Sequence, residues 1–310
     1  MEQESSRQGV RDLEPHLSYF VCFTPRSGST LLCEALHNTG VAGHPEEYFN
    51  RLTGAYVGDP LWKQEENSVH GHEYFERVLA WGTTPNGVFA LKVAASHLEV
   101  MDSTLRLMLP DNNGTLHERI AAAVPNAKYL LVTRRDKVKQ AVSLVKAKQT
   151  GRWMARRSER PQKHRVAYNF HLIDSAVREI LDEEAYWARY FARAGIMPHC
   201  IVYEDLVLDT PRALRGVMEY LNISLPRDFI LPASRLSRQA DEVSASWVQR
   251  YETAVQGRTK IRNLANIPLV LAHGALRETY VYPRAHQLGR ALFGLATRRH
   301  SVSESLPPAI

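Results

Sequence analysis

The sequence predicts a three-layer α/β fold with a central parallel sheet of about five strands. Short runs of apolar, β-branched and aromatic residues alternate with longer stretches in which apolar residues recur at helical spacing. Such alternation is typical of parallel sheets whose strands are joined by right-handed crossover helices. The composition agrees, because 44% of the 310 residues are hydrophobic and 23% are charged, as in globular proteins with a sizeable core.

The strands and helices can be placed along the chain. The first strand, YFVCF, is broken after its end by Pro25, and the helix that starts at Thr30 ends before Gly40, a residue favoured after a helix C-terminus. The run KYLLV is too apolar for an exposed edge, which favours a central position. The predicted strands are residues 19–23, 88–93, 127–133 and 199–203. Beyond the helix from Thr30, the predicted helices are residues 116–124, 136–150, 166–194 and 211–221.

The chain divides by composition into three parts. Residues 1–17 are polar and predict a flexible N-terminal arm, and residues 18–256 predict one catalytic domain. Residues 257–310 carry short apolar stretches between basic residues, which predicts a C-terminal helical extension with a frayed end. Packing of this extension on the main body or a partner, and peripheral contact with a membrane surface, are both open at this point.

The charge balance indicates an anionic partner without naming one. A net charge of +6 and a pI near 9.2 suit nucleic acid, an anionic membrane surface or a small polyanionic ligand, and also an ordinary solvated basic surface. Residues 151–165 are rich in Arg and have no long apolar run. This segment predicts either a solvated loop or a lid that closes over an anionic ligand.

Cysteine usage and the N-terminus predict a cytoplasmic protein. Cys22, Cys33 and Cys200 form no CxxC pair and have no histidine at metal-ligand spacing, so we expect buried thiols and no metal site. Their low, odd number fits a reducing compartment. The N-terminus lacks the apolar segment of a secretory signal, and no uncharged apolar stretch reaches the roughly 18 residues of a membrane span. We expect a soluble protein, with any membrane contact peripheral and on the inner face.

The segment TPRSGST, residues 24–30, has the pattern of an anion-binding loop. It lies between a predicted buried strand and a predicted helix, as in P-loop-like folds. Small residues let the backbone approach a phosphate, the N–H groups at the helix N-terminus point at it, and hydroxyl groups add donors. Arg26 supplies positive charge. The loop is not a Walker A motif, because GxxxxGK[ST] requires a Lys and a second Gly that are absent here.

A second basic site follows the strand KYLLV. Arg134 comes at its end, and Ser143 lies nine residues further on, in the next predicted helix. Open α/β sheets bind ligands at the carboxyl ends of their strands, where this arginine is expected. Together the two residues predict a site for another phosphate.

Segments in a fixed order also resemble a known family. They are FTPRSGSTLLCEAL, TGVAGHPEEYF, TPNGVFALK, TRRDKVKQAVSL and RQADEVSASWVQRY. Together, over residues 18–252, they resemble bacterial carbohydrate sulfotransferases of the trehalose 2-sulfotransferase and lipopolysaccharide sulfotransferase family. The resemblance implies a three-layer PAPS sulfotransferase fold and transfer of a sulfuryl group from 3'-phosphoadenosine 5'-phosphosulfate (PAPS) to a hydroxyl of a carbohydrate or glycolipid. It implies no metal and no nucleic-acid partner, and it implies a homodimer.

The resemblance assigns roles to individual residues. By it, Arg26, Ser27, Gly28, Ser29 and Thr30 hold the 5'-phosphosulfate of PAPS, and a separate pair holds the 3'-phosphate. That pair is Arg134 and Ser143. We expect Arg26 also to stabilise charge on the leaving phosphate during transfer.

A carboxylate is needed to activate the acceptor, because an alcohol is a poor nucleophile until its proton is removed. In the segment GHPEEYF the resemblance places this general base at Glu47, with Glu46 as the neighbouring alternative. Lys92, at the end of the second strand, either points into the site or is an ordinary surface residue. His44 replaces an acidic residue of the resembled trehalose enzyme, which leaves the acceptor sugar open.

Two other functions compete with sulfuryl transfer. A P-loop phosphotransferase using ATP shares the strand, loop and helix, but it should need the missing Lys and a hydroxyl on magnesium. A polyanion-binding protein without catalytic activity would use the Arg and Lys residues of 134–165 as a phosphate track, although few aromatic residues are interleaved there. The sequence therefore favours a PAPS-dependent sulfotransferase.

Overall fold

The sheet at the centre of the molecule has the strand order β2-β3-β1-β4-β5. The computed structural model describes residues 15–50, 71–109, 111–159, 165–237 and 240–256. β1 pairs in parallel with β3 and β4, β5 pairs in parallel with β4, and β2 is a short antiparallel edge strand on β3. The strands are β1 (Leu17–Phe23), β2 (Thr83–Thr84), β3 (Val88–Ala94), β4 (Lys128–Thr133) and β5 (His199–Val202). The predicted α/β class and five-stranded sheet are confirmed, with one antiparallel edge strand.

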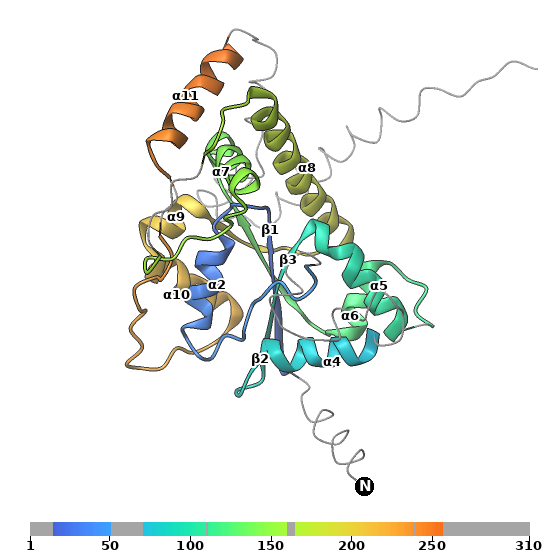
Figure 1. Ribbon diagram of the computed structural model, residues 1–310. Coiled ribbons are helices and arrows are strands. Elements are labelled where there is room, and N and C mark those ends of the chain that lie inside the picture. The colour runs from blue at the N-terminus through green and yellow to red at the C-terminus, as the bar shows by residue number, and fades with distance from the viewer. Residues whose placement is uncertain (1–14, 51–70, 110, 160–164, 238–239, 257–310) are drawn as a thin grey trace, which may run out of the picture. The chain divides into compact units, whose positions relative to one another are not determined.

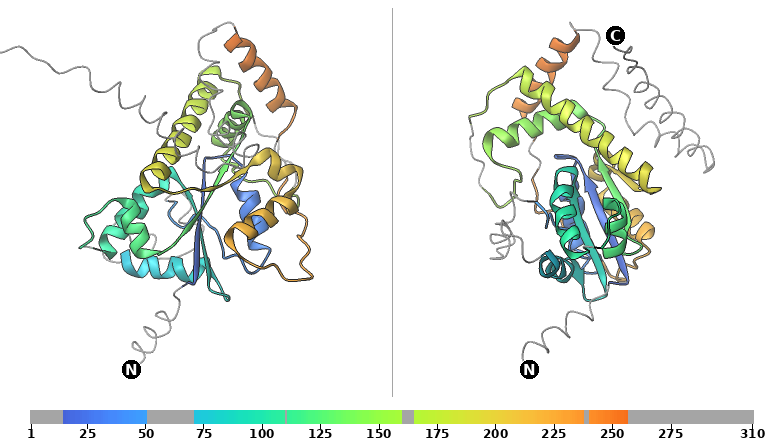
Figure 2. Two further views of the ribbon diagram at one scale, coloured as in Figure 1. Left: turned by 180° about the vertical axis from the view of Figure 1, so that it is seen from behind. Right: turned by 90° about the vertical axis from the view of Figure 1, so that its right-hand side faces the viewer.

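Helices cover both faces of the sheet (Figures 1 and 2). α2, α9 and α10 lie on one side, and α4, α5 and α6 lie on the other, while α7 and α8 extend beyond the carboxyl ends of the strands. The first of these are α2 (Ser29–His37), α4 (Gly71–Gly82), the 3-10 turn η3 (Ala95–His97), α5 (Leu98–Met108) and α6 (Leu116–Ala123). The rest are α7 (Lys137–Thr150), α8 (Phe170–Ala194), α9 (Tyr203–Leu208), α10 (Thr210–Leu221) and α11 (Glu242–Gln256).

The alternation of side chains along β1 explains how both faces are buried. Tyr19, Val21 and Phe23 point into the cluster formed with α2 and α10. Phe20 and Cys22 point to the opposite face, where the Phe20 ring packs against Tyr129 of β4. Full burial of such a side chain contributes roughly 1.5–3 kcal/mol, so a strand buried on both faces belongs at the centre of the sheet.

The carboxyl ends of β1, β3 and β4 lie side by side at one edge of the sheet. β1 runs into residues 24–28, β3 into η3, and β4 into residues 134–136 before α7 begins. These connections are the places where open α/β sheets bind ligands. The fold therefore brings together segments that are more than a hundred residues apart in the sequence.

Three further segments bear on how the site is built. Residues 203–206, YEDL, form the start of helix α9 and do not extend strand β5. Trp247 and Tyr251 of α11 are buried in a cluster with residues of α7 and α8, so they are core residues that pack α11 against these helices. In the segment 151–159, Arg156 forms an antiparallel bridge to Leu236, and residues 157–159 then form a turn.

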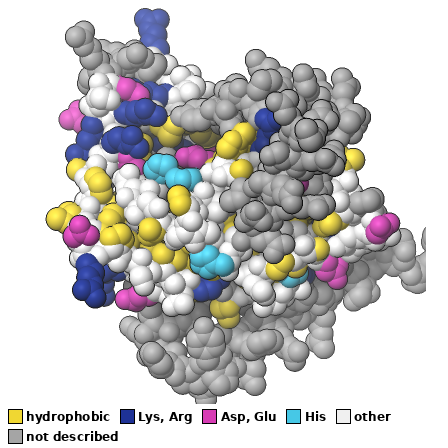
Figure 3. All heavy atoms as spheres, turned by 90° about the horizontal axis from the view of Figure 1, so that it is seen from below, with side chains coloured by type: hydrophobic (Ala, Val, Ile, Leu, Met, Phe, Trp, Pro, Cys, Tyr) yellow, Lys and Arg dark blue, Asp and Glu magenta, His cyan; other side chains and the backbone are white. Residues whose placement is uncertain are grey.

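Two predicted regions lie outside the described residues. They are most of the N-terminal arm, residues 1–14, and the whole C-terminal extension, residues 257–310. Within the described part of the chain, no helix is long and apolar enough to cross a membrane, and no group of His, Cys, Asp and Glu is placed to hold a metal ion. On the face shown in Figure 3, Lys and Arg side chains gather along one side while apolar side chains are scattered.

Candidate active site

The loop after β1 has an unusual backbone conformation. It begins with a turn in which the Ser27 N–H donates to the Thr24 carbonyl at 3.2 Å. Arg26 has φ 64 and Gly28 has φ 89, both in the left-handed region. A non-glycine residue with positive φ is uncommon, and it costs about 1–2 kcal/mol. In this conformation the side chain of Arg26 reaches Ser143 of α7.

Gly28 is required by space as well as by conformation. A Cβ atom built on it would lie 2.4 Å from Cδ2 of Tyr203. No other residue fits between the loop and that ring without a shift of the backbone or the ring. Tyr203, the first residue of α9, therefore sets how closely the loop packs on the rest of the site.

The loop and the start of α2 present unpaired hydrogen-bond donors. Among the described residues, the N–H groups of Gly28, Ser29 and Thr30 have no acceptor, and the N-cap Gly28 offers no side chain to them. Ser27 is completely buried, yet its hydroxyl oxygen has no partner within the described part of the chain. Buried polar groups are nearly always paired, so this arrangement indicates a ligand that accepts these bonds.

Gln140 of α7 holds the start of the loop by hydrogen bonds. It is fully buried, and its Nε2 donates to the hydroxyl of Thr24 at 2.9 Å and to the carbonyl of Pro25 at 2.8 Å. The sequence analysis did not identify this residue. The available signal was its position one helical turn before Ser143, on the same face of the predicted helix.

Arg26 contacts Ser143 and lies close enough to Arg134 for their charges to interact. Arg26 Nε donates to the Ser143 hydroxyl at 2.9 Å, and the Arg26 guanidinium also donates to the carbonyl of Trp153. Burial, and next the positive charge of Arg134, lower the pKa of Arg26 to about 10. Like charges held together in a buried place favour the binding of an anion between them.

Arg134 is held by residues of α9. Its guanidinium carbon lies 4.6 Å from the centre of the Tyr203 ring, and its Nε lies 3.7 Å from Oε1 of Glu204. Glu204 also accepts hydrogen bonds from the backbone N–H groups of Arg135 and Asp136, just before α7. The YEDL segment thus positions the arginine and the start of α7 together.

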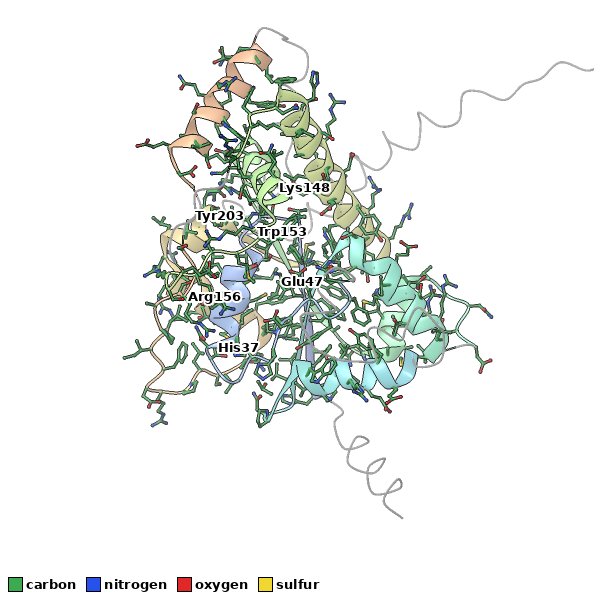
Figure 4. All side chains as sticks on the ribbon, in the orientation of Figure 1. His37, Glu47, Lys148, Trp153, Arg156 and Tyr203 are labelled. Carbon is green, nitrogen blue, oxygen red and sulfur yellow. The ribbon has the colours of Figure 1, made fainter. Side chains whose placement is uncertain are left out.

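Glu47 belongs to a second cluster and lies beside α2 in the view of Figure 4. Its Oε1 is 2.7 Å from Nζ of Lys92, and its Oε2 accepts a hydrogen bond from Nδ2 of Asn50 at 2.8 Å. Burial raises the pKa of Glu47, but the Lys92 ammonium and the hydrogen bonds outweigh it, so that the pKa lies below its usual value. The neighbouring Glu46 side chain is exposed, while its carbonyl accepts from the N–H of Lys92 in β3.

Lys92 and His97 complete the cluster around Glu47. Lys92 is buried and also donates to the hydroxyl of Thr30 at 3.1 Å, so it is not an ordinary surface residue. His97 Nδ1 accepts a hydrogen bond from the Ala94 N–H at 3.2 Å, which places the hydrogen of the neutral ring on Nε2. That Nε2 lies 3.7 Å from Oε2 of Glu47. His97 was not predicted, although it lies in η3, the 3-10 turn that follows β3.

The sequence profile of the Stf0 sulphotransferase family matches residues 18–254, most of the chain and all of the site. The chain belongs to this family. It is 32% identical over 254 residues to the trehalose 2-sulfotransferase of Mycobacterium tuberculosis, covering 75% of this chain and 93% of that protein. It is 29% identical over 260 residues to the trehalose 2-sulfotransferase of Mycolicibacterium smegmatis, covering 77% of this chain and 96% of that protein. A crystal structure of a sulfotransferase from Alicyclobacillus acidocaldarius is 15% identical, with a TM-score of 0.43, and covers 78% of this chain and 96% of that one.

This Stf0 sulfotransferase brings the predicted site residues together in two groups. Arg26, Ser143 and Arg134 form one group, with the loop residues Ser27 and Gly28 beside it. The second group surrounds Glu47, and the described contacts of its carboxylate are with Lys92, Asn50 and His97, with none to Arg26. Ser29 and Thr30, at the start of α2, lie between the two groups, and Thr30 contacts the second through Lys92.

Proposed function

We propose that this Stf0 sulfotransferase transfers a sulfuryl group from PAPS to a hydroxyl of a carbohydrate, with Glu47 as the general base. The observation that carries the proposal is the pair of anion sites at one sheet edge. One consists of the unpaired donors of the loop and α2, and the other of Ser143, the Arg26 guanidinium that contacts it and the neighbouring Arg134. A single ligand with two separated phosphates satisfies both, and PAPS is such a ligand.

The residues fit the two ends of the nucleotide. The loop hydroxyl of Ser27 and the N–H groups of Gly28, Ser29 and Thr30 would hold the 5'-phosphosulfate. Arg134 and Ser143 would hold the 3'-phosphate. Because the Arg26 guanidinium donates to Ser143, we assign its side chain to the 3'-phosphate as well, while its backbone shapes the loop. No part of this assignment requires the Lys and magnesium of an ATP-dependent enzyme.

The chemical step is an in-line displacement at sulfur. The acceptor oxygen forms a bond to sulfur as the bond between sulfur and the bridging oxygen of the 5'-phosphate breaks, and the proton of the acceptor hydroxyl passes to the carboxylate of Glu47. The electron pair of the broken bond stays on the 5'-phosphate. The N–H groups at the start of α2 are oriented before the reaction and stabilise this added charge.

A sugar acceptor is supported by the relatives, which are named for trehalose. Trehalose itself and a glycolipid sugar are the two acceptors to compare, and a homodimer and membrane contact through residues 257–310 stay predictions. His44 lies three residues before Glu47, and its Nδ1 is 2.9 Å from Nδ1 of His37. Burial, and next His37, lower the pKa of His44, which favours a neutral ring that hydrogen-bonds hydroxyl groups.

Calorimetry with 3'-phosphoadenosine 5'-phosphate, the nucleotide product, tests the donor site. Arg26→Ala and Arg134→Ala should each weaken binding roughly 10- to 150-fold, since hydrogen bonds to charged groups contribute about 1.5–3 kcal/mol. Arg135→Ala is the matched control, because Arg135 is adjacent but exposed and paired with Asp205. No binding by folded wild-type protein would overturn the proposal, and binding of ATP with magnesium or of duplex DNA instead would favour its rivals.

The acceptor is identified by mass spectrometry. The wild-type protein is incubated with PAPS and with trehalose or a sugar-bearing glycolipid, and the products are searched for the mass of one added sulfuryl group. Sulfation of either acceptor that is lost in Glu47→Gln supports the proposed reaction. Nucleotide binding with full activity retained in Glu47→Gln would refute the role of this base and leave the donor site standing.

A further inference from the structure

The ammonium group of Lys92 connects the two halves of the site. Its Nζ lies 2.7 Å from Oε1 of Glu47 and 3.1 Å from the hydroxyl oxygen of Thr30, and its side chain is 6% exposed. Thr30 is the second residue of α2, within the turn whose N–H groups are unpaired among the described residues. A group that binds to that turn is therefore close to the ammonium that binds the base.

In the absence of a donor, the ammonium works against the base. A carboxylate that holds a charged hydrogen bond with an ammonium accepts a further proton less readily, because protonation weakens that bond. The Coulomb attraction on the Lys92 ammonium would change once the 5'-phosphosulfate occupies the neighbouring turn, since its phosphate and sulfonate together carry more negative charge than one carboxylate. Because Nζ already contacts both Glu47 and Thr30, a small movement of the side chain is enough to bring the ammonium to a group bound at that turn.

We propose that Lys92 makes the base dependent on the donor: it pairs with Glu47 in the free enzyme and turns to the sulfonate when PAPS binds, which leaves Glu47 able to accept the acceptor's proton. This inference rests on the proposed function. Lys92 keeps its own proton throughout, so the only proton transferred is the one from the acceptor hydroxyl to Glu47. Donor binding thus precedes effective activation of the acceptor.

The other groups around Glu47 keep the carboxylate in place when the ammonium turns away. His97 of η3 directs Nε2–H toward Oε2 from 3.7 Å, and Asn50 donates to the same oxygen at 2.8 Å. Burial lowers the pKa of His97, so the ring stays neutral at physiological pH and does not replace the charge of Lys92. From α2 the buried thiol of Cys33 faces this cluster with its pKa raised to about 12, chiefly by burial, and Glu46 is the adjacent carboxylate.

The test follows the ionisation of Glu47 directly. Protein labelled with carbon-13 at glutamate carboxyl groups is titrated by NMR with and without saturating PAPS, in the absence of an acceptor, and Glu47→Gln assigns the resonance. The apparent pKa of Glu47 should rise when the nucleotide binds. Calorimetry on the same samples establishes that the nucleotide is bound.

Variants of Lys92 test whether its ammonium group causes the change in the pKa of Glu47. In Lys92→Met the pKa of Glu47 should already be raised without nucleotide and should change little on adding it. Lys92→Arg keeps the charge and should restore a difference between the two conditions. Lys128→Met is the control for loss of a strand lysine, because Lys128 donates to carbonyls at the end of α10, at 2.9 and 3.1 Å.

Failure of this inference and failure of the proposed function give different results. If the nucleotide binds and the pKa of Glu47 does not rise in the wild-type protein, the role of Lys92 is wrong and the donor site stands. If calorimetry detects no nucleotide binding, the proposed function itself is wrong. Should Lys92→Met not fold, the wild-type titration and Lys92→Arg still decide the question.

Discussion

Replacement of Ser27 by alanine should have opposite effects on stability and on ligand binding. Ser27 is completely buried, and its hydroxyl oxygen has no partner among the described residues. Leaving a buried polar group unpaired costs about 1–3 kcal/mol. Ser27→Ala should therefore stabilise the free protein, by about 1 kcal/mol after the small loss of packing.

When the nucleotide is present, Ser27→Ala should instead make the protein less stable than the wild type. The same hydroxyl should donate to a phosphate oxygen, and a hydrogen bond to a charged group contributes about 1.5–3 kcal/mol, so the dissociation constant should rise roughly 10- to 150-fold. At a ligand concentration about 100 times the wild-type dissociation constant, the ligand stabilises the wild-type protein by about 2.7 kcal/mol. A variant that binds about 30-fold more weakly gains only about 0.9 kcal/mol at that concentration.

Urea denaturation with and without 3'-phosphoadenosine 5'-phosphate measures both effects, provided that unfolding is two-state. Thr24→Val is the matched control, because Thr24 is equally buried but its hydroxyl accepts a hydrogen bond from Gln140 at 2.9 Å. This variant should destabilise the free protein by about 1 kcal/mol. Equal destabilisation in both variants, or unchanged nucleotide affinity in Ser27→Ala, would show that the unpaired hydroxyl is not a ligand-binding group.

Further substitutions separate catalysis, loop geometry and stability. Glu47→Gln should lower kcat/KM by about 10²- to 10⁴-fold with nucleotide affinity retained in calorimetry, whereas Glu46→Gln should not. Gly28→Ala should abolish nucleotide binding, because the residue has φ 89 and the new Cβ would lie 2.4 Å from a ring atom of Tyr203. Gly40→Ala is its control, because Gly40 also has positive φ, 68, but no atom lies within 4 Å of the new Cβ. This variant should only lower the unfolding free energy, by about 1–2 kcal/mol in urea denaturation. Lys137→Met leaves the buried carboxylate of Glu184 in α8 without its ion-pair partner and should lower the unfolding free energy by about 3–5 kcal/mol. A second substitution, Glu184→Leu, should recover most of that loss.

The sheet and the position of the anion loop were predictable because their signals are local. The buried run before Pro25 and the helical spacing after Thr30 are contained in one short segment, and the strand-loop-helix unit that they predict is present. The interval between Arg134 and Ser143 also places both residues by local rules, one at a strand end and one on a helix face. Their roles in binding PAPS stay predictions.

The direction of the Arg26 side chain was not predictable in the same way. Its expected role at the leaving phosphate stays a prediction, and in the structure its guanidinium donates to Ser143, which is 117 residues away in the sequence, and to the carbonyl of Trp153. The contact with Ser143 depends on a positive φ at a residue other than glycine and on how α7 packs against the loop. Neither of these can be read from the sequence of the loop.

Lys92 and Tyr203 show where residue type alone left alternatives open. A lysine near the end of a strand is usually exposed, and only the approach of α2 to β3 shows that this one is buried against Thr30. The predicted strand 199–203 included Tyr203, but this residue begins helix α9, in which Glu204 accepts hydrogen bonds from the backbone before α7. In both cases a contact between distant segments decides the outcome.

The order of strands explains how one reaction can draw on both groups of residues. β1 lies between β3 and β4, so the loop that leaves β1 has the Glu47 cluster of β3 on one side and the arginine site of β4 on the other. A nucleotide held at its 3'-phosphate on the β4 side must extend across β1 to place its sulfonate beside β3. Lys92 of β3 contacts both Thr30 at the start of α2 and Glu47, and this position is what would allow one ammonium to couple binding of the donor to the proposed base.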